Sequence, residues 1–337
     1  MLAYAVPRIP ITLLTGFLGS GKTTLLNRLL ASNHAERIAI VVNEFGDVSI
    51  DGSLVVGTSE DLIELQNGCI CCTIRGDMRE TVAALLERRA RRFWRRIRFD
   101  RIVIEASGVA SPGPVVQTFL ADPELSERTR VDGVVALAHA AHVKEQLAFH
   151  PEACQQIGYA DTILLNHCDR SDDAGQVEAE TALRRINPMA SIVRTEHAEL
   201  PPDRVLHLET TDPGRWKLDL AEADPSEESS ERDGSPHGHT AGMSALTLRT
   251  RRTLDIHRLR IWLQFVGQRR TWELMRLKGI VRCRDHGPRV VVQGIYQWME
   301  LRPEMGAAPD ESLLVLIGRD LDHVELRKGW EAVTGVD

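Results

Sequence analysis

IPITLLTGFLGSGKTTLLNRLL, residues 9–30, is the stretch of the sequence from which the fold is predicted. Its apolar beginning is typical of a strand buried on both faces, and its leucine-rich end has helical spacing. Between the two, GFLGSGKT (16–23) matches the phosphate-binding pattern G-x-x-x-x-G-K-[ST]. Glycines let a backbone wrap closely around phosphates, and the N–H groups of the loop and helix N-terminus supply positive potential. The stretch therefore predicts a nucleoside triphosphate site on a strand–loop–helix unit.

The candidate phosphate contacts begin in this loop. Lys22 is expected to reach the β- and γ-phosphates, and the Thr23 hydroxyl is expected to hold Mg²⁺. A second apolar strand, RIVIE (101–105), ends in Glu105, where such a protein needs a carboxylate near Mg²⁺. An acid at a strand end is by itself more often an ordinary loop residue, so this assignment depends on the loop. The expected contacts are Gly16, Gly19, Ser20, Gly21, Lys22, Thr23, Thr24, Glu105 and Gly108, with Lys22, Thr23 and Glu105 as the catalytic set.

The base is expected to be read at Asn166-His167-Cys168-Asp169, which follows the apolar run DTILL (161–165). A guanine-reading N-K-x-D motif would fall at this position, and Asp169 is predicted to accept hydrogen bonds from the guanine N1–H and amine, which adenine cannot offer. His167 stands where the motif has lysine. A lysine stem packs on a purine face, and an imidazole stacks there differently. GTP is therefore favoured over ATP, with an ordinary Asn/Asp turn as the alternative reading of Asn166 and Asp169.

The rest of the chain is predicted to form an α/β protein with a second, smaller domain. Apolar runs at 37–43, 132–138, 161–166 and 191–195 alternate with helical patterns, which indicates right-handed crossovers and a mostly parallel sheet. This P-loop NTPase domain is expected over residues 1–205. A mobile acidic linker is expected over 206–242, because the segment 221–242 has almost no large apolar residues. A smaller α+β domain is expected over 243–337.

Composition limits the function further. With 43% hydrophobic and 26% charged residues, the 337-residue chain is typical of soluble globular proteins. The formal net charge of −7 argues against nucleic acid as the main partner. No apolar run approaches the roughly 18 residues of a membrane span, and no secretory signal is apparent. We therefore expect a cytoplasmic protein. The arginine-rich segment 88–98 is read as a solvated helix face, with an RNA, acidic-partner or lipid surface as the alternative.

Three of the six cysteines, Cys69, Cys71 and Cys72, fall within four residues. Thiolates are soft ligands that suit Zn²⁺ and Cu(I), so this C-x-C-C group is a candidate metal site. Further ligands are needed to complete it, from the same chain or from a second subunit of a homodimer. Glu44, in the loop NEFGD (43–47) where a switch segment is expected, is a candidate. Inert buried thiols and a redox pair remain the alternatives, and His237 and His239 form at most a weak metal site.

In combination these motifs resemble the CobW family of P-loop GTPases. The resemblance rests on the phosphate loop, NEFG (43–46), GCICC (68–72), EASG (105–108) before Pro112, and three motifs near the C-terminus. Those three are RLKGI (276–280), VVQG (291–294) and IGRD (317–320). The resemblance implies a GTPase that acts as a metallochaperone. GTP binding and hydrolysis would be coupled to transfer of a transition metal, zinc first and cobalt or iron otherwise, to a client metalloprotein. It places Cys69, Cys71 and Cys72 on the family's metal-binding motif and Glu44 on its switch segment.

Two positions depart from the family pattern. His167 replaces the lysine of the guanine motif, and His139 replaces an aspartate at the end of the run 132–138. These replacements bear on guanine selectivity and turnover. Two other functions stay open: a P-loop ATPase or kinase that acts on a small molecule, and a nucleotide-dependent metal sensor that does not hydrolyse usefully.

Overall fold

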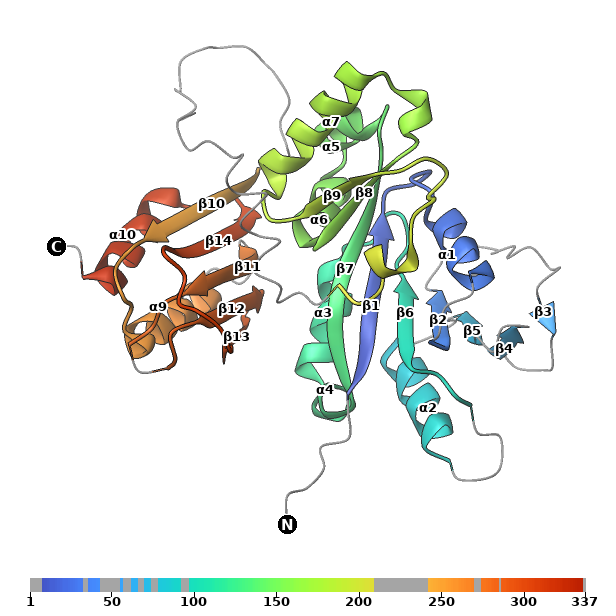
Figure 1. Ribbon diagram of the computed structural model, residues 1–337, viewed down its shortest axis with the longest axis horizontal. Coiled ribbons are helices and arrows are strands. Elements are labelled where there is room, and N and C mark those ends of the chain that lie inside the picture. The colour runs from blue at the N-terminus through green and yellow to red at the C-terminus, as the bar shows by residue number, and fades with distance from the viewer. Residues whose placement is uncertain are drawn as a thin grey trace. The chain divides into compact units, whose positions relative to one another are not determined.

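The computed structural model describes residues 8–32, 36–42, 55–56, 62–65, 70–73, 78–91, 97–208, 242–269, 274–284 and 286–335. It divides into two compact units (Figure 1). The first unit comprises residues 1–143, 160–177 and 192–210, and the second comprises residues 144–159, 178–191 and 211–337.

A nine-stranded sheet with the order β3-β4-β5-β2-β6-β1-β7-β8-β9 organises the first unit. Six neighbouring strands, from β5 to β8 in that order, pair in parallel, whereas β4 pairs antiparallel with both β3 and β5. The strands are β1 (Ile9–Gly16), β2 (Ile38–Val42), β3 (Val55–Val56), β4 (Leu62–Leu65), β5 (Ile70–Thr73), β6 (Arg101–Glu105), β7 (Thr129–His139), β8 (Thr162–Asn166) and β9 (Ser191–Arg194). The predicted α/β fold with a mostly parallel sheet is confirmed.

Helices follow the strands as a parallel sheet requires. They are α1 (Lys22–Ala31), α2 (Met78–Ala90), α3 (Pro112–Ala121), α4 (Pro123–Arg128), α5 (Val143–Phe149), α6 (Pro151–Tyr159) and α7 (Asp173–Ile186), with short 3₁₀ turns η1 (Cys168–Arg170) and η2 (Pro202–Arg204). The leucines of α1 pack with Leu14, Ile40 and Val103 of the sheet in one buried cluster. Leu206 and Leu208 also belong to that cluster, so the chain is still packed at the first residues of the expected linker. Residues 209–241 of that linker lie outside the described residues.

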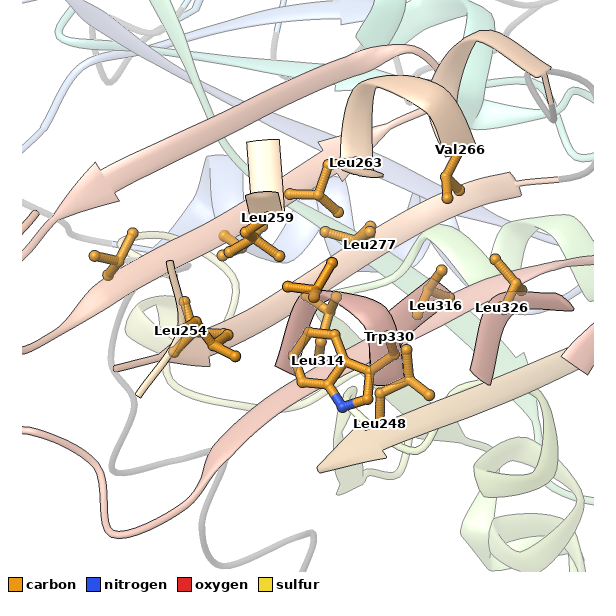
Figure 2. Close-up of a cluster of buried hydrophobic side chains, with 14 of the residues drawn as sticks. Leu248, Leu254, Leu259, Leu263, Val266, Leu277, Leu314, Leu316, Leu326 and Trp330 are labelled. Carbon is orange, nitrogen blue, oxygen red and sulfur yellow. The ribbon is translucent and has the colours of Figure 1, made fainter. Parts of the chain in front are cut away.

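The second unit is built on an antiparallel sheet with the order β10-β14-β11-β12-β13. Its strands are β10 (Met243–Thr250), β11 (Leu274–Val281), β12 (Val290–Ile295), β13 (Trp298–Pro303) and β14 (Ser312–Arg319), and its C-terminal helices are α9 (Ile256–Arg269) and α10 (His323–Thr334). Leucines of α9 and of the strands surround the buried indole of Trp330 (Figure 2). The predicted C-terminal α+β domain thus has its own core.

Helices α5 (from Lys144) and α6 and the part of α7 from Glu178 onward belong to this second unit, although their sequences lie within the expected range of the first domain. For α6 the reason is close packing of its last turn. A Cβ placed on Gly158 would lie 3.1 Å from Met243 Cε, and the rings of Tyr159 and Tyr296 are 5.9 Å apart. No helix that the structure describes has both the length and the apolar character to span a membrane.

Candidate nucleotide and metal site

The phosphate loop joins the end of β1 to the start of α1, as its sequence predicts. Gly16, Gly19 and Gly21 have φ angles of 144°, 74° and 104°, which residues other than glycine rarely adopt. Two of these glycines are also needed for space. A Cβ on Gly16 would lie 2.5 Å from the Leu137 carbonyl oxygen, and one on Gly21 would lie 2.3 Å from Asn166 Nδ2. Gly16 and Gly21 therefore occupy positions of the loop where a larger residue does not fit.

Polar groups of the loop are available for an anion. Lys22 Nζ donates a hydrogen bond to the Gly16 carbonyl oxygen at 2.8 Å, which holds the ammonium group over the loop. The hydroxyls of Thr15 and Ser20 are buried and have no hydrogen-bond partner within the described residues. Buried hydroxyls are normally satisfied, so these two fit a loop whose further partner is a bound ligand. Backbone, ammonium and hydroxyl groups together suit the phosphates of a nucleotide.

The residues expected at Mg²⁺ lie on adjacent elements. Glu105 ends β6 and is 6% exposed, and its Cα pairs in register with that of Leu14 in β1, just before the loop. Thr23 is an exposed residue of the first turn of α1. Gly108 lies against the loop, because a Cβ there would be 2.6 Å from Leu18 Cδ2. A hydroxyl and a carboxylate are oxygen ligands of the kind that Mg²⁺ binds, so these residues fit the ion.

Asn166 connects the base-reading segment to the phosphate loop. It is fully buried at the end of β8, and its Nδ2 donates to the Ser20 carbonyl oxygen at 2.9 Å. Its Oδ1 accepts a hydrogen bond from the Ala198 N–H at 2.8 Å. The loop 195–198 was not predicted as part of the site. A backbone N–H makes its contact with Asn166, so its only sequence signal is that it follows the last strand of the sheet.

Asp169 and His167 occupy the positions expected for base recognition. Asp169 lies in η1 with its side chain 30% exposed, and Arg170 Nε is 3.9 Å from its Oδ2. His167 has a left-handed backbone with φ of 62°. Its ring stacks on that of His139 with centroids 4.3 Å apart and an interplanar angle of 20°. The two departures from the expected motif are therefore in contact with each other.

Both of these imidazoles are held in the neutral form. Burial, followed by the nearby His167, His142 and Arg170, lowers the pKa of His139 to about 4, against an opposing effect of Asp169. Burial also lowers the pKa of His167, with Arg170 and His197 acting in the same direction. Asp169 and a hydrogen bond to the Gly19 backbone oppose that decrease in the His167 pKa. At neutral pH this side of the site thus lacks the cation that a lysine would supply.

Part of the expected metal site is described. Cys71 and Cys72 are consecutive residues of β5, which pairs in parallel with β2 at Ile40↔Cys71 and Val41↔Cys72. The other predicted ligands, Cys69 and Glu44, lie outside the described residues, as do residues 92–96 of the arginine-rich segment. In the sheet, β5 is next to β2, β2 is next to β6, and β6 ends in Glu105. The cysteine strand is thus two strands from the carboxylate expected at Mg²⁺.

The remaining cysteines do not extend this site. Cys154, Cys168 and Cys283 are free and buried. Burial raises the pKa of the Cys154 and Cys283 thiols to about 11, so both are protonated at neutral pH. Within the part of the chain that the structure describes, no group of three or more His, Cys, Asp or Glu side chains is arranged to hold a metal ion.

Residues 10–194 match the CobW/HypB/UreG nucleotide-binding domain, and residues 243–334 match the C-terminal domain of the cobalamin synthesis protein CobW. The zinc chaperone YjiA of Escherichia coli (strain K12) is 42% identical over 193 residues, 57% of this chain and 59% of that protein. The aligned segment thus spans less than two thirds of that relative. The zinc-regulated GTPase metalloprotein activator 1 of Schizosaccharomyces pombe is 29% identical over 94% of this chain and 84% of its own length. The crystal structure of Zn(II)-bound YjiA GTPase from E. coli superimposes with a TM-score of 0.77 and 30% identity, over 97% of this chain and 99% of that one.

Proposed function

Because the chain belongs to the CobW family, we propose that it is a metal-binding GTPase that acts as a metallochaperone. In this proposal, GTP binding and hydrolysis are coupled to transfer of a transition metal to a client metalloprotein. Zinc is the proposed cargo, because thiolate ligands suit it and because two relatives are named as a zinc chaperone and a zinc-regulated activator. Cobalt and iron are the alternatives.

The observation that carries the proposal is the order of strands in the first sheet. The cysteine strand β5, the strand β2 that leads to Glu44, and β6 with Glu105 are hydrogen-bonded neighbours. Adjacent strands lie about 4.8 Å apart, so β5 and β6 are separated by roughly 10 Å. A shift of β6 on loss of the γ-phosphate could therefore be transmitted to the proposed metal-binding strand β5 through one intervening strand, β2.

The phosphate end of the site supplies positioning and positive charge. When GTP binds, Lys22 exchanges the Gly16 carbonyl oxygen for the β- and γ-phosphate oxygens, while the loop N–H groups and the start of α1 hold the phosphates. Thr23 and Glu105 are the proposed holders of Mg²⁺, which when bound neutralises charge that develops on the phosphates. Gly108 lies against the loop at Leu18, and in this proposal its backbone N–H contacts the γ-phosphate when GTP is bound.

Metal release follows from linkage between the two ligands. If GTP and zinc both favour one arrangement of the segment between β2 and β5, each raises the affinity of the other by the same factor, typically about 5- to 150-fold. Loss of the γ-phosphate on hydrolysis then lowers zinc affinity and frees the ion for the client. The client's identity, a cytoplasmic location and a homodimer that shares the cysteine motif are parts of the proposal that need their own experiments.

Steady-state hydrolysis tests the proposal. GTP and ATP are each supplied with Mg²⁺, with and without stoichiometric Zn²⁺, to the wild-type protein, Lys22→Ala and the double variant Cys69→Ser/Cys71→Ser. We expect GTP-selective turnover that responds to Zn²⁺, loss of turnover in Lys22→Ala, and loss of the Zn²⁺ response in the cysteine variant. Cys154→Ser is the matched control, because a serine hydroxyl can keep the bond that Cys154 Sγ donates to the Leu147 carbonyl oxygen (3.1 Å). A hydrolysis rate that Zn²⁺ does not change, or a higher rate with ATP than with GTP, would contradict the proposal.

The non-hydrolysing metal sensor is the second candidate, and one observation favours it. The neutral ring of His167 stands where the guanine motif has a lysine, which weakens the case for rapid, guanine-selective turnover. A sensor would bind GTP and zinc with mutual effects on affinity but would show no turnover above that of Lys22→Ala. The same hydrolysis experiment, combined with zinc titration in the presence of a non-hydrolysed GTP analogue, separates the two functions.

A further inference from the structure

Three imidazoles lie together at the carboxyl edge of the first sheet, beside the phosphate loop. His139 is the last residue of β7, and it pairs in register with Asn166, the last residue of the neighbouring strand β8. His167 follows directly and stacks on His139, with centroids 4.3 Å apart. His142 lies on His139 as well, with centroids 4.4 Å apart and rings tilted by 44°. The stack therefore links two strand ends where the base-reading segment begins.

A hydrogen bond identifies the form of the His139 ring. The backbone N–H of Ala141 donates to His139 Nδ1 at 3.2 Å, so Nδ1 must be an acceptor and the ring proton is on Nε2. A second proton on Nδ1 would break that bond. His139 is also only 6% exposed. Around the pair, Arg170, His142 and His197 disfavour a positive charge and Asp169 favours one. The hydrogen bond and the burial thus match a neutral His139.

Positions 139 and 167 are in direct contact, so a charge introduced at one of them alone would be partly buried beside an uncharged ring, which is unfavourable. Opposite charges introduced at both positions would face each other in place of the stacked rings. The pairing can therefore be tested by exchanging the two rings for an ion pair.

We propose that His167 supports the purine face of the bound nucleotide as an uncharged aromatic ring, and that His139 positions it by stacking. His167 is well placed for this role, because its Nε2 would be 3.7 Å from a Cβ on Gly21 of the phosphate loop, while Asp169 lies two residues further on. The inference rests on the proposed function in one respect, that a nucleotide occupies this loop.

A four-member mutant cycle tests the pairing. Wild type, His139→Asp, His167→Lys and the double variant are compared by the dissociation constant of a fluorescent GDP at pH 7.5, without zinc. In His167→Lys the new cation faces His139 and Arg170 and must share the Asp169 carboxylate with that arginine, so we expect affinity to fall about tenfold. In the double variant the ion pair is complete, and affinity should return to within about threefold of wild type. If the effects of the two substitutions simply add, the pairing is wrong.

Aromatic and aliphatic replacements of His139 test the stacking. His139→Ala should weaken nucleotide binding about three- to tenfold, the range expected for loss of one aromatic pair. His139→Phe should recover most of that loss, because it keeps a ring but no ionisable nitrogen. Equal weakening in both variants, or none in His139→Ala, would overturn the positioning role. Urea unfolding of each variant shows whether it is folded, so a loss of stability is not mistaken for a loss of stacking.

The same measurements distinguish failure of this inference from failure of the proposed function. Lys22→Ala is included in the series. If it binds fluorescent GDP as tightly as wild type, or if wild type does not bind, the nucleotide does not occupy this loop and both proposals are wrong. If wild type binds, Lys22→Ala does not, and the histidine cycle is additive, only the stacked-pair inference is overturned.

Discussion

The phosphate end and the base end of the nucleotide site are held in different ways. At the phosphate loop, the path is set by backbone conformation, with Gly16, Gly19 and Gly21 at positive φ and two of them in close contact with neighbouring strands. At the base end, the arrangement depends on side chains: the amide of Asn166, the carboxylate of Asp169 and the stacked rings of His139 and His167.

This difference explains where the chain keeps the expected motif and where it departs from it. A backbone path that requires glycine has no substitute among L-residues, so each glycine of the motif is present. A contact between two side chains can be replaced by another contact if both members change together. The contact of His139 with His167 is of this kind, because two side chains make it at the base end of the site.

The largest effect is expected for Gly16→Ala, which tests the backbone-built end. A Cβ there would lie 2.5 Å from the Leu137 carbonyl oxygen, with φ at 144°, so the loop and β7 must separate. We expect a loss of more than about 3 kcal/mol in the free energy of unfolding, together with loss of nucleotide binding.

Gly19→Ala is the matched control, because its φ is 74° and no atom lies within 4 Å of the added Cβ. It should cost only about 1 kcal/mol, the usual penalty for a left-handed residue other than glycine. Urea denaturation and binding of a fluorescent nucleotide measure both effects. Similar stability of the two variants would show that close packing does not determine the loop.

Sequence patterns predicted the backbone-built parts of the molecule better than the rest. The six continuous apolar runs chosen as strands of the first sheet correspond to β1, β2, β6, β7, β8 and β9, because burial on both faces leaves a strong signal. Strands β3, β4 and β5 were missed, since they are two to four residues long and include glutamate and cysteine. The turn between β12 and β13 has no sequence signal either, because Tyr296 adopts a φ of 51° there although it is not glycine.

At the site, the residue types identified the candidate ligand contacts but did not show which of these residues contact one another. Asn166, Asp169 and the phosphate loop were chosen from their motifs, and the structure places Asn166 against the loop. The contact of His139 with His167 depends on the register of β7 and β8, which no single sequence displays. The loop 195–198 joins the site through the Ala198 N–H, which donates to Asn166, and through the Thr195 carbonyl oxygen, which accepts from the Cys168 N–H. Backbone contacts of this kind leave no trace in residue type.

Acid is expected to destabilise the folded chain through the buried ring of His139. An unfolded histidine has a pKa of about 6.5, whereas burial lowers the pKa of folded His139 to about 4. As the pH falls, the unfolded chain therefore takes up the proton before the folded chain does. The contribution of neutral His139 to the free energy of unfolding is complete above pH 6.5 and is lost as the pH falls toward 4. This shift corresponds to about 3 kcal/mol of unfolding free energy across that range.

His139→Phe removes the group and should flatten this part of the pH profile, measured by urea denaturation between pH 4 and pH 8. Because other groups titrate in the same range, the comparison of interest is the difference between wild type and variant at each pH. Parallel profiles for the two proteins would show that His139 is as accessible to protons in the folded chain as in the unfolded one.

A smaller and more selective effect is expected at Asp169. Replacing it by alanine removes a charged acceptor for the guanine N1–H and amine, which should weaken GTP binding about tenfold. Binding of ATP should hardly change, since adenine offers no such donors. Competition of GTP and ATP against a fluorescent nucleotide gives both constants in one series. An equal loss for both nucleotides would mean that Asp169 supports the loop and does not read the base.

The smallest effect is expected at Arg170, and it shows how far side chains alone determine the base end. Arg170 Nε lies 3.9 Å from Asp169 Oδ2, with the arginine side chain 63% exposed, and exposed pairs of this kind contribute less than about 1 kcal/mol. Arg170→Gln should therefore change GTP affinity by less than about fivefold, and the difference should shrink as salt is added. A larger, salt-independent loss would mean that Arg170 holds Asp169 in position, and the base end would then depend on one more side-chain pair than the stack and the Asn166 amide.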